Sequence, residues 1–366
     1  MGIISNDSIK ISGISEEFEL RDLNIMVKPN EHGCARLSIR VKNDGKPENI
    51  IKNVEDKLIT IKSSEDGNSG TLFKGYIAKC CINSRESSGV VNIELVSASI
   101  KLEEEVESES YQKIEDTYEN VVKGAIKKAS GVNSYYEAKY ASKTIDKPII
   151  RYKETAWEFI KRIASRHRLP IIVDETADKP TFTAGYKKEG SVPEDKIDKA
   201  SIAGFVKMVD YSVRKLNEKN TTVTSDDYTG ITFRSFYNFK IGDSVSYKGA
   251  SYNICSKTVK TEGSQLVFIY EAGTDKLYGL EPMHNEKLHG RCLEGKVVKT
   301  NKEYIKMQLD IDKEKKSESE LYEFKWMPET GNIMYAMPEK DTVVSLYVGG
   351  TDEGDAIVIN ALRKNE

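Results

Sequence analysis

The chain lacks the segments that would export it or hold it in a membrane. Its first residues, MGIISNDSIK, contain no apolar run of the length that a secretory signal needs. No stretch approaches the ~18 apolar residues of a membrane span. We therefore expect synthesis in the cytoplasm and no stable insertion into a membrane.

Cysteine and histidine are also scarce. The 5 Cys stand at irregular spacing, which is typical of reduced, buried thiols rather than of a disulfide framework. His284 and His289 lie close to Cys292, but this spacing matches no standard zinc motif and lacks a fourth ligand. We predict neither a metal nor a cofactor.

The sequence contains no motif of a named catalytic mechanism. It has neither a Gly-rich phosphate loop nor a nucleophile elbow. Acidic pairs are abundant at this composition, so counting them leaves a lysozyme-like acid pair open. No extra segment of lysozyme size is present, because strand-rich regions use up the length. We predict that the chain is not an enzyme, with a cell-wall hydrolase as an alternative.

An excess of basic charge is absent as well. The 55 basic and 58 acidic residues give a net charge of −3, whereas a nucleic-acid-binding domain usually carries a basic excess. We therefore expect no nucleic-acid binding. Hydrophobic residues at 38% and charged residues at 31% describe a polar globular protein, whose length suggests about two or three domains.

Residues 1–100 have the pattern of an all-β region. Ala35–Val41 alternates apolar and polar side chains with period two, and Leu58–Ile61 and Val90–Leu95 are further predicted strands. Asn43–Gly45 is a turn signal. Short strands at this density are typical of a barrel or a sandwich.

Residues 204–280 return to this pattern with two predicted hairpins. Ser244–Tyr247 and Tyr252–Ile254 flank a Lys-Gly turn, and Thr258–Lys260 and Leu266–Tyr270 flank a second turn. Two β regions of similar length thus bracket a helical middle, which is compatible with two related β domains.

The middle of the chain changes in composition. An acidic run, Glu103–Glu109, favours a solvated segment, and Tyr111–Ala129 is a predicted helix with one apolar face. Pro148–Glu175 then predicts a strand, a helix and a second strand. Pro170 stops the helix, and Ile171–Val173 follows as a buried strand.

The helix within Pro148–Glu175 carries a start signal. Thr155 and Glu158 have the spacing of a capping box, in which each side chain bonds the other residue's backbone N–H. Trp157 and Ile160 fall on one helical face, so we expect them to be buried against neighbouring strands. These four residues are predicted structural residues.

The C-terminal region, residues 286–366, reads as a separate small β domain. Ile305–Ile311 alternates apolar and polar side chains, and Gly349–Gly354 forms a wide turn before the strand Ala356–Ala361. About five strands in this length is the size of an OB-fold.

Tyr322, Phe324 and Trp326 lie on one face of a predicted strand in this region. Such a stripe can stack nucleic-acid bases, as OB-folds often do, and an OB-fold nucleic-acid binder is the alternative function. No basic cluster surrounds the stripe, so the sequence favours a core or a subunit interface.

Three segments in order resemble one family. They are NEHGCARLSIRV near the start, RYKETAWEFIKRIAS in the middle, and WMPETGNIMYAMPEKDTVVSLYVGGTDEGDAIVINALRKN near the end. Together they resemble the baseplate and tail-hub family of contractile injection systems. That family includes phage baseplate hub proteins, late-control protein D and the VgrG proteins of type VI secretion.

The resemblance implies a mainly β fold with minor α. It comprises a first tube-like antiparallel β-barrel (residues 1–100), a helical and strand–helix–strand middle region (101–200), a second barrel (201–285) and a C-terminal OB-fold (286–366). It also implies a homotrimeric structural hub, a symmetry adaptor between a six-fold tail tube and a three-fold spike, assembled into the baseplate of a phage, bacteriocin or related particle.

The partners implied are the tail tube protein, other baseplate proteins and a separate spike or tip protein, because no needle-like repeat precedes Glu366. For subunit or spike contact the sequence offers two sets of candidate residues. These are Tyr322, Phe324 and Trp326, and the turn residues Gly349, Gly350, Thr351 and Asp352.

Overall fold

The computed structural model describes residues 4–42, 46–52, 57–65, 69–82, 89–127, 131–217, 222–328 and 337–362. The predicted turn Asn43–Gly45 lies outside these residues. The chain forms two compact units that are interleaved in sequence, whereas the sequence predicted four consecutive ranges. The first unit comprises Met1–Lys101, Gly131–Glu137 and Arg168–Leu280, and the second comprises Leu102–Ser130, Ala138–His167 and Glu281–Glu366.

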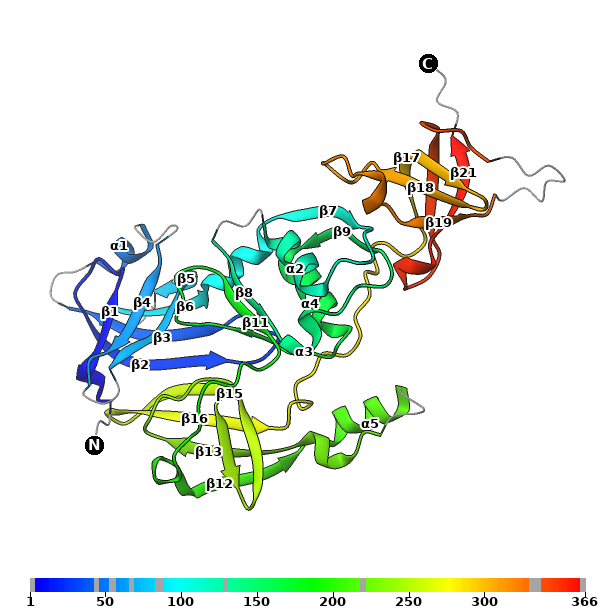
Figure 1. Cartoon of the computed structure of the whole chain (residues 1–366). Helices are drawn as coiled ribbons and strands as arrows, with labels where there is room; N and C mark the ends of the chain where they lie inside the picture. Colours follow the sequence, from blue (N-terminus) through cyan, green and yellow to red (C-terminus); the bar gives the residue numbers. More distant parts are fainter. Residues whose placement is uncertain are drawn as a thin grey trace. The chain divides into compact units, whose positions relative to one another are not determined.

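The first unit is built on one 11-stranded sheet that joins both predicted β regions (Figure 1). Its N-terminal strands are β1 (Ile9–Ser12), β2 (Phe18–Val27), β3 (Cys34–Val41), β4 (Ile59–Ser63), β5 (Gly70–Ile82) and β6 (Val90–Ser97). Its C-terminal strands are β12 (Asp198–Val206), β13 (Thr229–Ser235), β14 (Ser244–Tyr247), β15 (Ala250–Glu262) and β16 (Gln265–Gly273). The junction is the antiparallel pair of β2 and β15, in which Val27 faces Lys257.

Alternation along these strands places one face in the core. In β3, Ala35, Leu37 and Ile39 are buried while Arg36 is exposed, and full burial of a large aliphatic side chain contributes about 1.5–3 kcal/mol. The first predicted hairpin is confirmed, since Tyr247 pairs with Ala250. Both turn residues have positive φ, 49° and 81°, as the turn type that suits a two-residue hairpin requires.

The other elements of the first unit surround this sheet. A second sheet has the order β10-β11-β8. Its strands are β8 (Asn133–Tyr136), β10 (Ile171–Val173) and β11 (Thr181–Ala184), and the helices are α1 (Pro47–Lys52) and α5 (Met208–Asn217). Short 3-10 turns are η1 (Asn6–Ser8), η3 (Glu194–Lys196) and η4 (Ser225–Tyr228), with η2 (Ala98–Glu103) where the chain passes between units.

The second unit begins with a two-stranded sheet of β7 (Val106–Tyr111) and β9 (Ile149–Thr155). Its helices are α2 (Tyr118–Ile126), α3 (Ala138–Ala141) and α4 (Ala156–Ser165). The helix predicted over Tyr111–Ala129 therefore starts later than expected. Tyr111 ends β7 opposite Ile149, and the Thr117 side chain accepts from the Asn120 N–H at 3.2 Å, which caps α2 at that point.

The second half of the acidic run differs from its prediction as a solvated segment. Glu107 and Glu109 belong to β7, and each has a carboxylate oxygen 3.3 Å from Nη1 of Arg151. The Glu107 side chain is 8% exposed and that of Arg151 is 1% exposed. The second half of the run is therefore part of a paired strand, in which two charges neutralise a buried arginine, while Glu104 and Glu105 are exposed as predicted.

The rest of the second unit is a closed barrel with the strand order β17-β18-β19-β21-β20, drawn orange to red in Figure 1. The strands are β17 (Arg291–Asn301), β18 (Tyr304–Leu309), β19 (Glu323–Trp326), β20 (Val343–Val348) and β21 (Ile357–Leu362), with 3-10 turns η5 (Glu318–Glu320) and η6 (Glu353–Asp355). Ile150 of β9 packs into the barrel core. The mainly β fold predicted from the sequence is confirmed.

Candidate functional site

The predicted aromatic stripe lies largely inside the barrel. Phe324 and Trp326 of β19 are 1% and 7% exposed and belong to the barrel core. Tyr322 is half-buried and meets Phe324 edge to face, with ring centroids 5.0 Å apart. Phe324 and Trp326 are therefore withdrawn from any partner or nucleic-acid base while the barrel is closed. Tyr322 is the member of the stripe with a side chain at the surface.

The pairing of the barrel strands defines two ends. Arg291, where β17 begins, pairs with Val348, where β20 ends, and we call this the near end. At the opposite, far end, Asn301 pairs with Tyr304 and Val343 pairs with Leu362. Since Gly349–Asp352 directly follows β20, this predicted contact turn lies at the near end.

Part of the turn is exposed and part is anchored. Gly349, Gly350 and Thr351 are exposed. Asp352 Oδ2 lies 2.9 Å from Nζ of Lys147, which also lies 3.1 Å from Oδ1 of Asp355. Burial alone would raise the pKa of the Asp352 carboxyl, but the hydrogen bonds from Lys147 and the Gly354 N–H, together with the charge of Lys147, outweigh burial and lower the pKa. The turn thus has a fixed base and an open tip.

A buried ion cluster ties the base of the turn to helix α4. Arg162 on α4 is 2% exposed and lies between Glu154 and Glu353, which are 5% and 3% exposed. Its Nε and Nη2 donate to the two carboxylate oxygens of Glu154 at 2.8 and 2.7 Å, and its Nη1 donates to Glu353. Arg166 Nη2 reaches the other oxygen of Glu353 at 3.0 Å. Burial alone would lower the pKa of Arg162, but hydrogen bonding to Glu154 and the charge of Glu353 raise it.

The start of α4 has the predicted capping box. The Glu158 N–H donates to Thr155 Oγ1 at 3.1 Å, and the Thr155 N–H donates to Glu158 Oε2 at 2.9 Å. Trp157 and Ile160 are 4% and 0% exposed, as predicted. The helix is therefore fixed at its first turn and along its apolar face, which holds Arg162 in place.

The segment that leads into the barrel is bonded along its length. The Met283 N–H donates to Ser165 Oγ at 2.9 Å, and Asn285 Nδ2 donates to the Tyr152 carbonyl at 2.9 Å. A ring nitrogen of His284 lies 3.1 Å from the carbonyl oxygen of Thr351. The lead-in segment, α4 and the turn thus form one connected group within the second unit.

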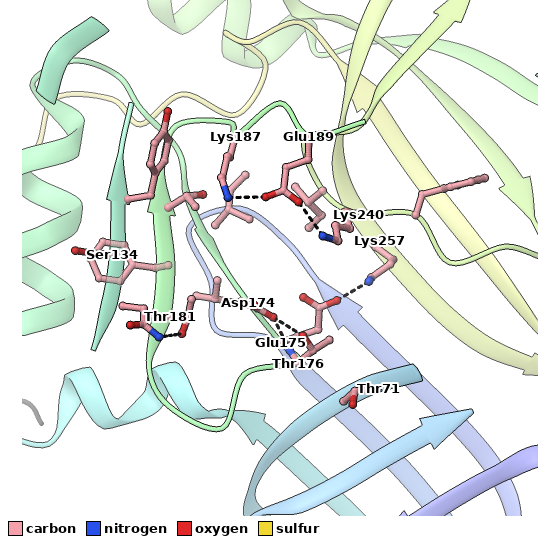
Figure 2. A pocket seen from close by; sticks show the side chains of 18 of the residues that line it. Thr71, Ser134, Asp174, Glu175, Thr176, Thr181, Lys187, Glu189, Lys240 and Lys257 are labelled. Atoms are coloured by element: carbon pink, nitrogen blue, oxygen red, sulfur yellow. Dashed lines mark hydrogen bonds and ion pairs between the residues drawn. The ribbon is translucent and has the colours of Figure 1, made fainter. Parts of the chain in front are cut away.

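The first unit contains a separate cavity of about 490 Å³, seen in Figure 2. At its side Glu189 accepts from Lys187 and Lys240, with N–O distances of 2.6 and 2.8 Å. The hydrogen bonds from Lys187 and Lys240 lower the pKa of Glu189 to about 2. Both lysines are largely exposed, so this charged group is in contact with solvent.

A second charged group of the cavity is buried. Lys257 of β15 forms an ion pair with Glu175, and their side chains are 5% and 9% exposed. Nζ of Lys257 also donates to Oδ1 of Asn238 at 3.2 Å. Figure 2 shows the pair of Lys257 and Glu175 between the strands of the large sheet and the segment after β10.

Within the described ranges, no group of three or more His, Cys, Asp or Glu residues is placed to hold a metal ion. His167 packs against two tyrosine rings, with centroid distances of 4.4 Å to Tyr118 and 4.6 Å to Tyr140. Burial lowers its pKa to about 4, helped by the nearby charges of Lys143 and Arg166. Among the residues that the structure describes, no helix is long and apolar enough to cross a membrane.

Sequence reasoning missed the buried cations of both units, among them Arg162 and Lys257. The sequence gives no local sign of the partner of Arg162, because Glu353 lies 191 residues away. Lys257 sits in an ordinary strand pattern, and Glu175 and Asn238 carry no local signal. An arginine on the same helical face as Phe159 and Ile163 was the one available hint.

No known family model matches the sequence, and no curated protein is significantly similar to it. Solved structures are similar in fold. The E. coli c3393 protein, described as a component of the type VI secretion system with structural similarity to the T4 bacteriophage tail proteins gp27 and gp5, aligns with a TM-score of 0.64 and 11% identity, covering 96% of this chain and 98% of that one.

Two further structures show the same likeness. A chain of the Francisella PdpA–VgrG complex aligns with a TM-score of 0.58 and 10% identity over 100% of this chain and 79% of that one. The 43 kDa tail protein of prophage MuSo2 from Shewanella oneidensis aligns with a TM-score of 0.52 and 11% identity over 77% and 100%. The chain therefore has the fold of the tail-hub proteins that its sequence motifs resemble.

Proposed function

We propose that this protein is a structural hub of a phage tail or related contractile injection machine. The observation that carries the proposal is the fold likeness to the c3393 protein across 96% of this chain and 98% of that one. A likeness of that extent covers the large sheet, the middle region and the barrel together. If the likeness covered the barrel alone, an isolated OB-fold protein would be an equally good interpretation.

The hub acts as a homotrimer that joins a six-fold tail tube to a three-fold spike. Its large sheet combines two β regions, which in three copies supply six tube-like units around one axis. Closed symmetry of this kind requires different surfaces of each copy to meet around the ring. The particle can be a phage, a bacteriocin or a secretion device, assembled in the cytoplasm with other baseplate proteins.

The C-terminal barrel serves as the OB-fold of this hub. It is closed, and its third and fifth strands, β19 and β21, are parallel while the other pairs are antiparallel. Five strands in this small closed arrangement agree with an OB-fold. Tyr322 is the candidate subunit contact, and Gly349, Gly350 and Thr351 are the candidate spike contact.

Light scattering on the complex recovered with the spike tests the assembly. We expect the mass of three copies of the 41.2 kDa chain plus spike. A stable hexamer or an obligate dimer in that complex contradicts the hub. A monomer of the isolated chain does not, because a partner can supply the assembly energy.

A pull-down with paired surface variants tests the spike contact. Thr351→Arg changes the exposed tip of the near-end turn, and Tyr304→Arg changes an exposed position of the far end that is 42% exposed. We expect Thr351→Arg to lose the spike and Tyr304→Arg to keep it. The opposite result moves the spike contact to the far end of the barrel.

If the protein is a structural hub, we expect it to have no enzymatic activity. Purified protein should leave peptidoglycan intact in a zymogram that contains a known muramidase as positive control. Cleavage that is lost when one carboxylate is substituted supports the cell-wall hydrolase instead.

A further inference from the structure

Three side chains in the first unit bring together an amine, a carboxylate and a side-chain amide. Lys257 Nζ is bonded to Asn238 Oδ1 at 3.2 Å and is ion-paired with Glu175. We propose that these residues form a covalent cross-link, an isopeptide bond between Lys257 and Asn238, with Glu175 as the general base. This inference is independent of the hub function.

The loop that carries Asn238 is pinned on both sides. The hydroxyl of Tyr270, a fully buried residue, donates to the carbonyl of Tyr237 at 2.8 Å and accepts from the N–H of Phe239 at 2.7 Å. Asn238 stands between these two anchors, and Tyr270 lies directly opposite Lys257 in the β15–β16 pair. One tyrosine therefore holds the amide beside the strand that carries the amine.

The amine and the base are also fixed. Lys257 is paired with Val27 on one side and with Tyr270 on the other, in the interior of the large sheet. The carbonyl of Glu175 accepts from the N–H of Lys74 at 2.7 Å. A lysine becomes a nucleophile when an adjacent base takes its proton, and holding the partners in contact replaces a bimolecular encounter.

The reaction exchanges one amide for another. Glu175 takes a proton from the Lys257 ammonium, and the Nζ lone pair attacks Cγ of Asn238 to give a tetrahedral intermediate. A second Nζ proton passes to Nδ2, the Cγ–Nδ2 bond breaks and ammonia leaves. The ammonia takes the proton from Glu175 and departs as ammonium, so Glu175 is again a carboxylate and no oxidant or water is consumed.

The cavity gives the leaving group an exit route, which a purely structural ion pair would not need. Lys257, Glu175 and Asn238 all line it, so the leaving ammonium has a path to solvent. Lys240 lines the same cavity and pairs with Glu189, but its side chain is 75% exposed, where water competes for its protons. Lys240 therefore provides a matched control for Lys257.

Intact mass spectrometry of the purified, denatured full chain tests the cross-link. We expect a mass below that of the sequence by one ammonia. A proteolytic digest should contain one branched peptide that joins the Lys257 and Asn238 segments. A wild-type mass equal to that of the sequence overturns the proposal.

Four variants locate the chemistry, each compared with its own sequence mass. We expect Lys257→Arg, Asn238→Ala and Glu175→Gln to show no deficit, and Lys240→Arg to keep it. A deficit that persists in Lys257→Arg assigns the ammonia loss to a succinimide elsewhere and overturns the proposal. Because the branched peptide is sought in the wild-type digest, a variant that fails to fold leaves the test intact.

Discussion

At the scale of single residues, Arg162 is tightly held. A guanidinium removed from water costs several kcal/mol unless its donors are satisfied. Glu154 receives two of its N–H groups, Glu353 a third, and the Ile150 carbonyl accepts at 2.9 Å. Arg162 thereby connects α4 with the base of the barrel turn.

Arg162→Ala should therefore destabilise the protein by about 3–5 kcal/mol, because the buried Glu154 loses its arginine partner and the buried Glu353 keeps only Arg166. Chemical denaturation followed by circular dichroism measures the change. Arg166→Ala is the control, since its side chain is 24% exposed, and it should cost about 1 kcal/mol or less. Equal costs for the two variants contradict the assigned role.

Trp157→Ala should cost about 3–5 kcal/mol, as expected for a large aromatic side chain removed from a core. Its half-buried neighbour Lys161, whose Nζ lies 5.7 Å from the Trp157 ring centroid, supplies the control Lys161→Ala. That variant should change the unfolding free energy by less than about 1 kcal/mol. A loss for Trp157→Ala below that level means that the helix face is misassigned.

His167 should make stability depend on pH. Its pKa is lowered to about 4 in the folded state, against about 6.5 when unfolded. The unfolded state then binds more protons between these values, so stability is full above pH ~6.5 and falls as pH drops toward ~4. Urea midpoints across this range should fall for the wild type and fall less for His167→Phe; an unchanged slope refutes the assignment.

At the scale of elements, local sequence patterns were sufficient to predict those features that depend on interactions between neighbouring residues. The hairpin of β14 and β15, the burial in β3 and the cap of α4 all follow from residues within a few positions of one another. The predicted start of α2 was wrong because the apolar pattern of the helix continues back to Tyr111. In the structure Tyr111 pairs with β9 instead. The pairing of β2 with β15 could not be predicted from the sequence, since nothing near Val27 specifies Lys257 as its partner.

The same reasoning predicts the effect of the α4 cap. Thr155→Ala should cost about 1 kcal/mol, the usual value for an N-cap, while Thr155→Ser should cost clearly less because the accepting oxygen remains. Thermal unfolding of the two variants measures this difference. Equal losses for both variants mean that the methyl group, rather than the cap, matters.

At the scale of the whole molecule, the candidate site depends on long-range connections. The sequence identified the turn Gly349–Asp352 but not its anchors, because Lys147 and Arg162 belong to another region of the chain. The predicted domain boundary near residue 286 likewise gives no sign that Ile150, which precedes it in the chain, packs into the barrel core. The barrel therefore belongs to one compact unit with Leu102–Ser130 and Ala138–His167.

Deletion from Gly290 onward should consequently do more than remove the barrel. The shortened chain loses Glu353 and exposes Ile150, so the amides of α4 should exchange with deuterium faster than in the full chain. The large sheet of the first unit, whose contacts stay intact, serves as the internal control. Unchanged protection of α4 indicates that the barrel is an independent domain.

The pairing of β2 with β15 also has a consequence in time. During synthesis at about 5–20 residues per second, β2 and β3 leave the ribosome many seconds before Lys257 exists to pair with Val27. One edge of β2 then stays open, and an open apolar edge invites pairing with another nascent chain. Yield of this protein should accordingly depend on translation speed and on holding chaperones, even though the finished sheet has covered that edge.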